Sequence, residues 1–135
     1  MAPMPKFEVF REYDKSQLVY EDEYVLDGKR LKPWDEYPMP FSGAWCVVRP
    51  RTQSGSHTQI DQEIFIAIKG EATLVIGDER RPFKIGDTAV IPKHTDHYVD
   101  NDTDEDFEFY VLWWDVEHAE QYLSDVTEKT GCLDV

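Results

Sequence analysis

The residues from Gly43 to about Asp115 form short runs of β-branched and aromatic side chains, and this texture most constrains the fold. Glycine, proline or aspartate interrupts the runs about every eight to twelve residues, which is typical of an all-β sandwich or barrel. Glycine reaches positive φ without steric cost, so the pairs Gly70-Glu71 and Gly77-Asp78 suit tight hairpins. The expected strands are Ala44–Arg49, Gln62–Lys69, Ala72–Ile76, Arg80–Ile85, Thr88–Ile91, His97–Asn101 and Phe107–Trp114.

The two flanks differ in texture from this central region. Residues 1–42 contain five prolines, so we expect an irregular arm that adds edge strands but little helix. After Trp114, apolar residues recur at three- and four-residue spacing, which predicts one amphipathic helix near 116–127 packed against the barrel. The expected organisation is therefore an N-terminal arm (1–42), a β-barrel (43–115), and a C-terminal helix and tail (116–135).

Charge and composition exclude several classes of function. The chain has 28 acidic and 14 basic residues and a formal net charge of −14, which repels nucleic acid and anionic membrane surfaces. No apolar run approaches the roughly 18 to 20 residues needed to span a bilayer, and the N-terminus lacks a secretory pattern. We therefore expect a cytoplasmic protein in which Cys46 and Cys132 remain reduced thiols.

One apolar strand carries a residue that needs an explanation. Alternate residues of a strand share a face, so Glu63 points to the same side as Phe65 and Ala67. A buried, unpaired carboxylate is unfavourable, so Glu63 requires solvent, a basic partner or a metal. Histidines are the nearest candidates to share its pocket, and His57 and Gln59 point the same way as each other.

These residues fall in two stretches that resemble the paired motifs of the cupin superfamily. In the first stretch, His57, Gln59, Glu63 and Gly70 stand at the motif's spacing, and in the second, Gly86, Pro92, His97 and Asn101 do. The resemblance implies a cupin jelly-roll β-barrel over about residues 43–115, with a metal site inside it. Cupins commonly dimerise through such arms, so a homodimer is also expected.

The chain departs from the cupin motifs at three positions. Gln59 replaces the second histidine, His94 replaces a turn glycine, and Arg51 stands where the first motif usually opens with glycine. The resemblance implies that His57, Glu63 and His97 bind a divalent metal, with Gln59 as a weaker fourth ligand. Two histidines and one carboxylate with an open position suit Zn²⁺, which we favour over Fe²⁺ or Mn²⁺. The alternative is a barrel without metal, in which these residues only hydrogen bond to one another.

The remaining site predictions concern the pocket wall and proton transfer. His94 and Tyr98 are candidate catalytic groups that could move a proton, although the simpler interpretation of His94 is a turn residue. Trp45, Phe65 and Trp113 are expected to contact a small-molecule substrate.

The expected function is a redox-neutral, metal-assisted rearrangement or isomerisation of a small polar, amine-containing metabolite. A weaker resemblance, in EIFIAIKGEATLVI and in Trp113-Trp114-Asp115, is to the cupin units of hydrazine synthetases. It implies N–N bond formation with a methionyl-tRNA-synthetase-like partner. The alternatives are an Fe- or Mn-dependent cupin dioxygenase and a non-catalytic cupin that binds a small ligand.

Overall fold

The computed structural model of the protein describes residues 12, 14–31 and 39–130. The described part contains ten strands, a short 3₁₀ helix and one α-helix. In chain order the elements are η1 (Lys15–Gln17), β1 (Val19–Glu21), β2 (Leu26–Arg30), β3 (Ser42–Val48), β4 (Thr52–Gln53), β5 (Gln62–Lys69), β6 (Glu71–Ile76), β7 (Glu79–Lys84), β8 (Thr88–Ile91), β9 (His97–Asn101), β10 (Phe107–Trp114) and α1 (Val116–Thr130). No helix in these ranges is both long and apolar enough to cross a membrane.

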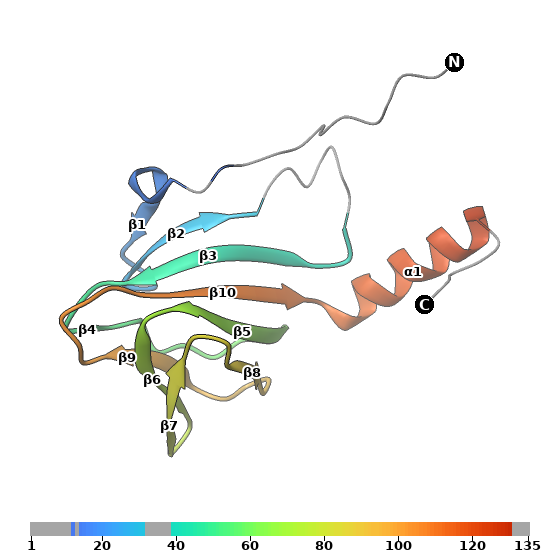
Figure 1. Cartoon of the computed structure of the whole chain (residues 1–135). Coiled ribbons are helices and arrows are strands. Elements are labelled where there is room, and N and C mark those ends of the chain that lie inside the picture. Colours follow the sequence, from blue (N-terminus) through green and yellow to red (C-terminus); the bar gives the residue numbers. More distant parts are fainter. Residues whose placement is uncertain (1–11, 13, 32–38, 131–135) are drawn as a thin grey trace.

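The strands form two antiparallel sheets (Figure 1). The larger sheet has the order β1-β2-β3-β10-β5-β8, and the smaller has the order β4-β9-β6-β7. Strands that follow one another in the chain often lie in different sheets, as β5 and β6 do and as β8 and β9 do. The predicted all-β jelly-roll barrel with one C-terminal helix is confirmed.

The hydrophobic core lies between the two sheets and follows the alternation of the strands. In β5, Glu63, Phe65 and Ala67 are buried, whereas the isoleucines between and after them are half-buried on the outer face. The smaller sheet contributes Leu74, Phe83 and Val99 to the same core. The interior is thus apolar almost throughout, which makes the buried Glu63 conspicuous.

Most of the predicted strands are present within one or two residues of their expected bounds. Those over Gln62–Lys69, Thr88–Ile91, His97–Asn101 and Phe107–Trp114 match the structure at both ends. The sequence analysis missed β4, because two residues are too few to show alternation. The arm contributes β1 and β2 at one edge of the larger sheet.

The expected hairpin at Gly70-Glu71 is wrong, because β5 and β6 belong to different sheets. Gly70 instead lies at a corner between the sheets, with φ of +82°. A Cβ atom at this position would lie 2.9 Å from the carbonyl oxygen of Asp106. The hairpin at Gly77-Asp78 is present and joins Ile76 to Glu79 in register.

Gly70 combines a positive φ with a close approach to the carbonyl oxygen of Asp106, and two alanine substitutions separate these two constraints. Gly86 also has a positive φ, +91°, but a Cβ atom there would meet nothing within 4 Å. We expect Gly86→Ala to lower the free energy of unfolding by about 1 kcal/mol, the cost of a left-handed alanine. Gly70→Ala adds a steric clash and should cost about 1 to 2 kcal/mol more. Urea denaturation measures both, and equal losses would contradict the close approach at Gly70.

The C-terminal helix α1 is longer than predicted and points in an unexpected direction. The Asp115 carboxylate accepts a hydrogen bond from the backbone N–H of Glu117 at 2.9 Å and so caps the first turn. Figure 1 shows α1 continuing from the end of β10 and extending away from both sheets. Within the described residues, the helix therefore does not close one side of the barrel, which corrects that expectation.

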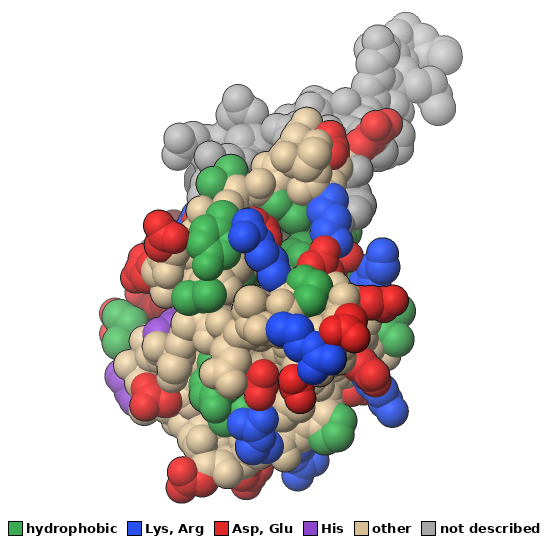
Figure 2. Space-filling view, turned by 90° about the vertical axis from the view of Figure 1, so that its left-hand side faces the viewer, with side chains coloured by type: hydrophobic (Ala, Val, Ile, Leu, Met, Phe, Trp, Pro, Cys, Tyr) green, Lys and Arg blue, Asp and Glu red, His purple; other side chains and the backbone are tan. Residues whose placement is uncertain are grey.

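On one face of the molecule, charged side chains of both signs are mixed rather than separated. Figure 2 shows acidic and basic side chains interspersed over one face of the molecule. Several arginines are paired with acids, including Arg49 with Asp27 at 2.9 Å and Arg80 with Asp100 at 2.8 Å. Such exposed pairs contribute little to stability, about 0 to 1 kcal/mol each.

Candidate metal centre

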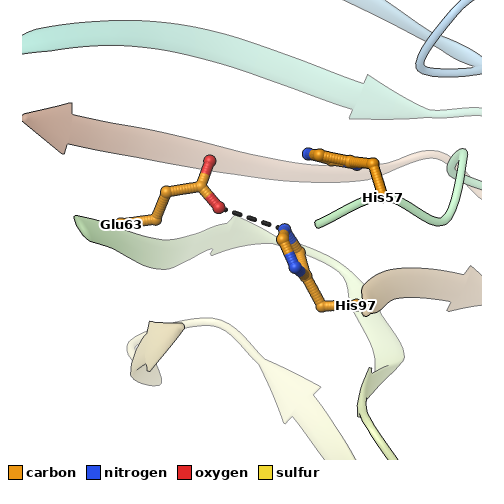
Figure 3. Close-up of side chains that lie close together, drawn as sticks. All are labelled: His57, Glu63 and His97. Atoms are coloured by element: carbon orange, nitrogen blue, oxygen red, sulfur yellow. Dashed lines mark ion pairs between the residues drawn. The ribbon is translucent and has the colours of Figure 1, made fainter. Parts of the chain in front are cut away.

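Three side chains that could hold a metal ion meet inside the barrel: His57, Glu63 and His97. One ligand atom of each lies within 4.8 Å of the others. Figure 3 shows them approaching from different segments, with Glu63 on β5, His97 at the start of β9 and His57 on the loop that precedes β5. The sequence analysis predicted these three residues as ligands, and the structure brings them together.

Backbone pairing fixes how the histidines approach each other. His57 and His97 form an isolated antiparallel bridge, in which the N–H of His97 donates to the carbonyl of His57 at 3.2 Å. The two rings lie 4.5 Å apart between centroids. Since His57 and His97 belong to different segments, the bridge joins the loop that carries one ligand to the strand that carries the other.

Carbonyl groups determine the tautomer of both rings. The Nδ1 atom of His57 lies 3.0 Å from the carbonyl oxygen of Gly55, and the Nδ1 atom of His97 lies 3.0 Å from that of Thr95. A carbonyl oxygen can only accept, so both Nδ1 atoms carry the proton. Each neutral ring therefore carries its lone pair on Nε2, as in histidines that bind metals through this atom.

Glu63 and His97 face each other in a contact that needs a cation or a proton. Their Oε2 and Nε2 atoms are 3.0 Å apart, both are buried, and neither has a hydrogen-bond partner among the described residues. Burial, the largest influence, lowers the pKa of His97, but the Glu63 carboxylate and the Thr95 carbonyl outweigh it, so this pKa is raised. The site thus favours positive charge between the two residues, and a divalent metal would supply it.

The dimensions of the site fit a divalent metal. Nitrogen and oxygen ligands bind Zn²⁺ at about 2.0 to 2.2 Å, so two ligands of one ion lie no more than about 4.4 Å apart. The ligand atoms here lie within 4.8 Å of one another. This upper bound is slightly above the limit of about 4.4 Å, so to bind one ion the side chains need at most a small movement toward one another.

Gln59 adjoins the centre but contacts a ligand through its nitrogen. Its Nε2 atom lies 2.7 Å from Nε2 of His57, so the amide N–H donates to the lone pair of the imidazole. For Gln59 to bind a metal, this hydrogen bond must break and the amide must present its oxygen. The fourth-ligand role of Gln59 stays a prediction.

A cavity of about 470 Å³ opens beside His57 and Glu63. Its apolar wall comes from the larger sheet and includes Leu26, Phe65, Phe109, Val111 and Trp113. Phe65 also packs edge-on against the ring of His97, with centroids 5.7 Å apart. Of the predicted substrate-contacting residues, Phe65 and Trp113 therefore lie in the wall of this cavity.

Two predicted site residues point away from the cavity. Trp45 lies on the outer face of β3, where its indole N–H donates to Oε1 of Glu108 at 3.1 Å. Tyr98 lies on the outer face of β9, where its hydroxyl oxygen accepts from Arg80 at 3.4 Å. Because adjacent strand residues point to opposite faces, Tyr98 cannot share the side of His97. The structure thus corrects the assignment of substrate contact to Trp45 and of proton transfer to Tyr98.

His94 takes the role of a turn residue. It has φ of +57°, its side chain is exposed, and its backbone N–H donates to the carbonyl of Gln59 at 2.9 Å. The hydrogen bond ties this turn to the loop that carries His57. The side chain of His94 does not line the cavity, so the structure does not place it where a catalytic group would act.

The sequence analysis missed Tyr24, which lies against a ligand. Its ring packs edge-on against His57, with centroids 5.3 Å apart, and it lines the cavity. The carbonyl of Tyr24 accepts a hydrogen bond from the N–H of Gly55 at 2.6 Å, and the carbonyl of Gly55 in turn orients His57. Burial raises the pKa of Tyr24, so its hydroxyl keeps its proton at neutral pH. Nothing in the proline-rich arm signalled this role.

The buried Cys46 lines the same cavity but is not a nucleophile. Burial is the main reason that its pKa rises to about 12, the charges of Glu21 and Glu63 add to the rise, and Arg30 opposes it. A thiol with this pKa stays protonated near neutral pH. Cys132 lies outside the described residues.

Comparison with known proteins agrees with this geometry. The family model described as "Cupin domain" matches residues 44–114, which is more than half of the chain. A search of curated proteins finds no match.

Several solved structures share the fold, and two of them also share much of the sequence. The plu4264 protein from Photorhabdus luminescens is 42% identical, with a TM-score of 0.79, and the match covers 88% of this chain and 98% of that one. A Cupin 2 conserved barrel domain protein from Salinispora arenicola is 38% identical, with a TM-score of 0.76 and coverage of 87% and 97%. The polyketide cyclase RemF from Streptomyces resistomycificus is 14% identical, with a TM-score of 0.65 and coverage of 78% and 80%, and shares the fold alone. The chain therefore belongs to the cupin family.

Proposed function

We propose that the protein is a metal-dependent cupin enzyme that catalyses a redox-neutral rearrangement or isomerisation of a small polar, amine-containing metabolite. The observation that carries this proposal is the arrangement of His57, Glu63 and His97 beside an open cavity, with the ligand atoms of all three within 4.8 Å of one another. A bound divalent metal, with Zn²⁺ favoured, would polarise a substrate oxygen and stabilise developing negative charge.

The residues around the centre support chemistry on a small molecule. The apolar wall, with Phe65 and Trp113, excludes water from a bound substrate. Tyr24 holds a proton on its hydroxyl at neutral pH and lies against His57, so it is the group we assign to donating that proton to the substrate. It takes the place of His94 and Tyr98 in this role.

Acidic side chains at the cavity favour a substrate with a positively charged amine. Glu21, Glu23 and Asp61 contribute to the lining, and two cations, Lys29 and Arg30, are also present. The carboxylates would attract an ammonium group toward the opening. This distribution supports the amine-containing substrate and does not identify it.

The test is anaerobic turnover by zinc-loaded protein with a mixture of small amine-containing metabolites, followed by mass spectrometry. A redox-neutral rearrangement consumes one compound and forms a product of the same mass. Glu63→Gln is the matched control, because it keeps the shape of the side chain while removing the ligand charge. A product that contains added oxygen atoms, or turnover that requires iron and dioxygen, would replace the proposal with the dioxygenase. Retention of a compound without turnover would replace it with a binding protein.

A further inference from the structure

Glu21 and Arg30 form an ion pair on the wall of the cavity, and the mechanism above does not use it. Nη1 of Arg30 lies 2.5 Å from Oε1 of Glu21. In register, Glu21 lies beside Leu26, and Arg30 lies beside Ala44. Both partners are buried core residues, so Glu21 and Arg30 belong to the inner face of the larger sheet.

Other observations show that this pair is directed at the cavity rather than at the outer surface. A Cβ atom on Gly28, the inner-face residue between Leu26 and Arg30, would lie 3.5 Å from Oε2 of Glu21. The carboxylate therefore lies over a position that has no side chain. Lys29, the other cation in the lining, belongs to the opposite face and donates to Oε1 of Gln17 at 2.8 Å. Among the described residues that line the cavity, Arg30 is thus the cation on the inner face of the sheet.

The ion pair and the metal centre lie at opposite ends of one apolar surface. Arg30, Ala44, Val111 and Phe65 are aligned across β2, β3, β10 and β5. Three strand spacings separate the backbones of the first and the last by about 14 Å. Glu63 follows on the inner face two residues from Phe65. Arg30 and Glu63 both line the cavity, so a small molecule bound in it can contact both side chains.

The chemistry of the pair selects one class of headgroup. The side chains of Arg30 and Glu21 are 48% and 27% exposed, so a ligand can reach both. Glu21 is the one partner of the guanidinium within the described ranges, which leaves further N–H groups to bind a carboxylate in the two-bond geometry that arginine favours. A zwitterion can bind both members at once and keep the local charge balanced, whereas a simple anion would face Glu21 and a simple cation would face Arg30.

We propose that Arg30 and Glu21 bind the carboxylate and the ammonium of an α-amino acid headgroup, and that the rest of the substrate extends along the apolar wall to the metal. The inference rests on the proposed function and names its substrate class.

The experiment measures binding of four hydroxamates to metal-loaded protein by calorimetry. Hydroxamates chelate divalent metals, so all four probes carry the same metal-binding group. L-Glutamate γ-hydroxamate has both the carboxylate and the ammonium, glutarate monohydroxamate lacks the ammonium, 4-aminobutyrohydroxamate lacks the carboxylate, and butyrohydroxamate lacks both. We expect the zwitterionic probe to bind at least about tenfold more tightly than each of the other three.

Two variants that remove one charge each assign the two halves of the headgroup. In Arg30→Gln, the advantage that the carboxylate confers should disappear, and in Glu21→Gln, the advantage of the ammonium should disappear. Butyrohydroxamate should bind both variants as it binds the wild type, because it reaches only the metal.

The outcomes separate this inference from the proposed function. Equal binding of all four probes to the wild type would overturn the headgroup site and leave the metal centre standing. An equal loss of all four probes in Arg30→Gln would mean that the pair only maintains the fold, which also overturns it. Failure of every probe to bind the metal-loaded wild type would overturn the proposed function itself.

Discussion

The His97→Ala protein is expected to purify with almost no bound metal, whereas the wild type carries about one divalent ion per chain. His97 supplies an imidazole lone pair that a carbonyl holds in the correct tautomer, and water cannot replace it. His57→Ala should behave in the same way for the same reason. Elemental analysis of the purified proteins, with a chelator competition to rank affinities, measures the effect. We expect an affinity at least about a hundredfold lower than that of the wild type.

Matched variants keep this prediction testable even if an alanine at a buried position disturbs folding. Glu63→Gln preserves the volume of the side chain and removes its charge, so it should lose metal while keeping the far-ultraviolet circular dichroism of the wild type. His94→Ala removes an exposed imidazole three residues from His97 and should keep the metal in full. Full metal content in His97→Ala or in Glu63→Gln would contradict the assignment of the centre.

The Gln59→Ala variant tests whether Gln59 is a metal ligand or only a hydrogen-bond partner of His57. If the amide oxygen binds the ion, its removal should lower metal affinity modestly, because a water molecule takes its place. If Gln59 only donates to the His57 lone pair, as its 2.7 Å contact indicates, its removal frees that lone pair and affinity should not fall. The same competition experiment measures this difference.

Local sequence patterns predicted the three residues that the candidate metal centre brings together, because each of them has a local signal. Alternation along β5 places Glu63 on the buried face with Phe65, and the cupin spacing adds His57 and His97. The two incorrect aromatic assignments have different causes. Tyr98 is adjacent to His97, so strand parity alone directs it outward. Trp45 has no such reference, because nothing in Ala44–Arg49 marks which face is inner.

Local sequence patterns could not predict which residues of the N-terminal arm line the cavity. Tyr24 and Arg30 reach the cavity because β1 and β2 pair with β3, and that pairing joins segments that no short motif connects. The resemblance to hydrazine synthetase units is carried by a local pattern, but this pattern is not specific to one reaction. It depends on strand residues such as those of β5, which the barrel needs for its core whatever the reaction. That assignment stays an expectation.

Asn101, which the sequence analysis placed only as the last residue of a motif, is the centre of a buried hydrogen-bond network. It is fully buried. Its amide nitrogen donates to three carbonyl oxygens, those of Val48, Arg49 and Glu105, at 3.0, 3.2 and 2.8 Å. Its amide oxygen accepts from the backbone N–H and the hydroxyl of Thr103, at 3.1 and 2.7 Å. One side chain thus joins the end of β3 to the loop after β9.

We expect Asn101→Ala to lower the free energy of unfolding by about 3 kcal/mol, because buried carbonyls lose their donor and cannot reach water. Asn101→Asp should cost at least as much at neutral pH, although it matches asparagine in shape, because it places a carboxylate against three carbonyl oxygens. Asp102→Ala is the control: its carboxylate is 85% exposed, and its loss should change stability by no more than about 0.5 kcal/mol. Urea denaturation compares the three variants. A stable Asn101→Asp protein would mean that shape alone, and not donation to the three carbonyls, holds this corner of the barrel together.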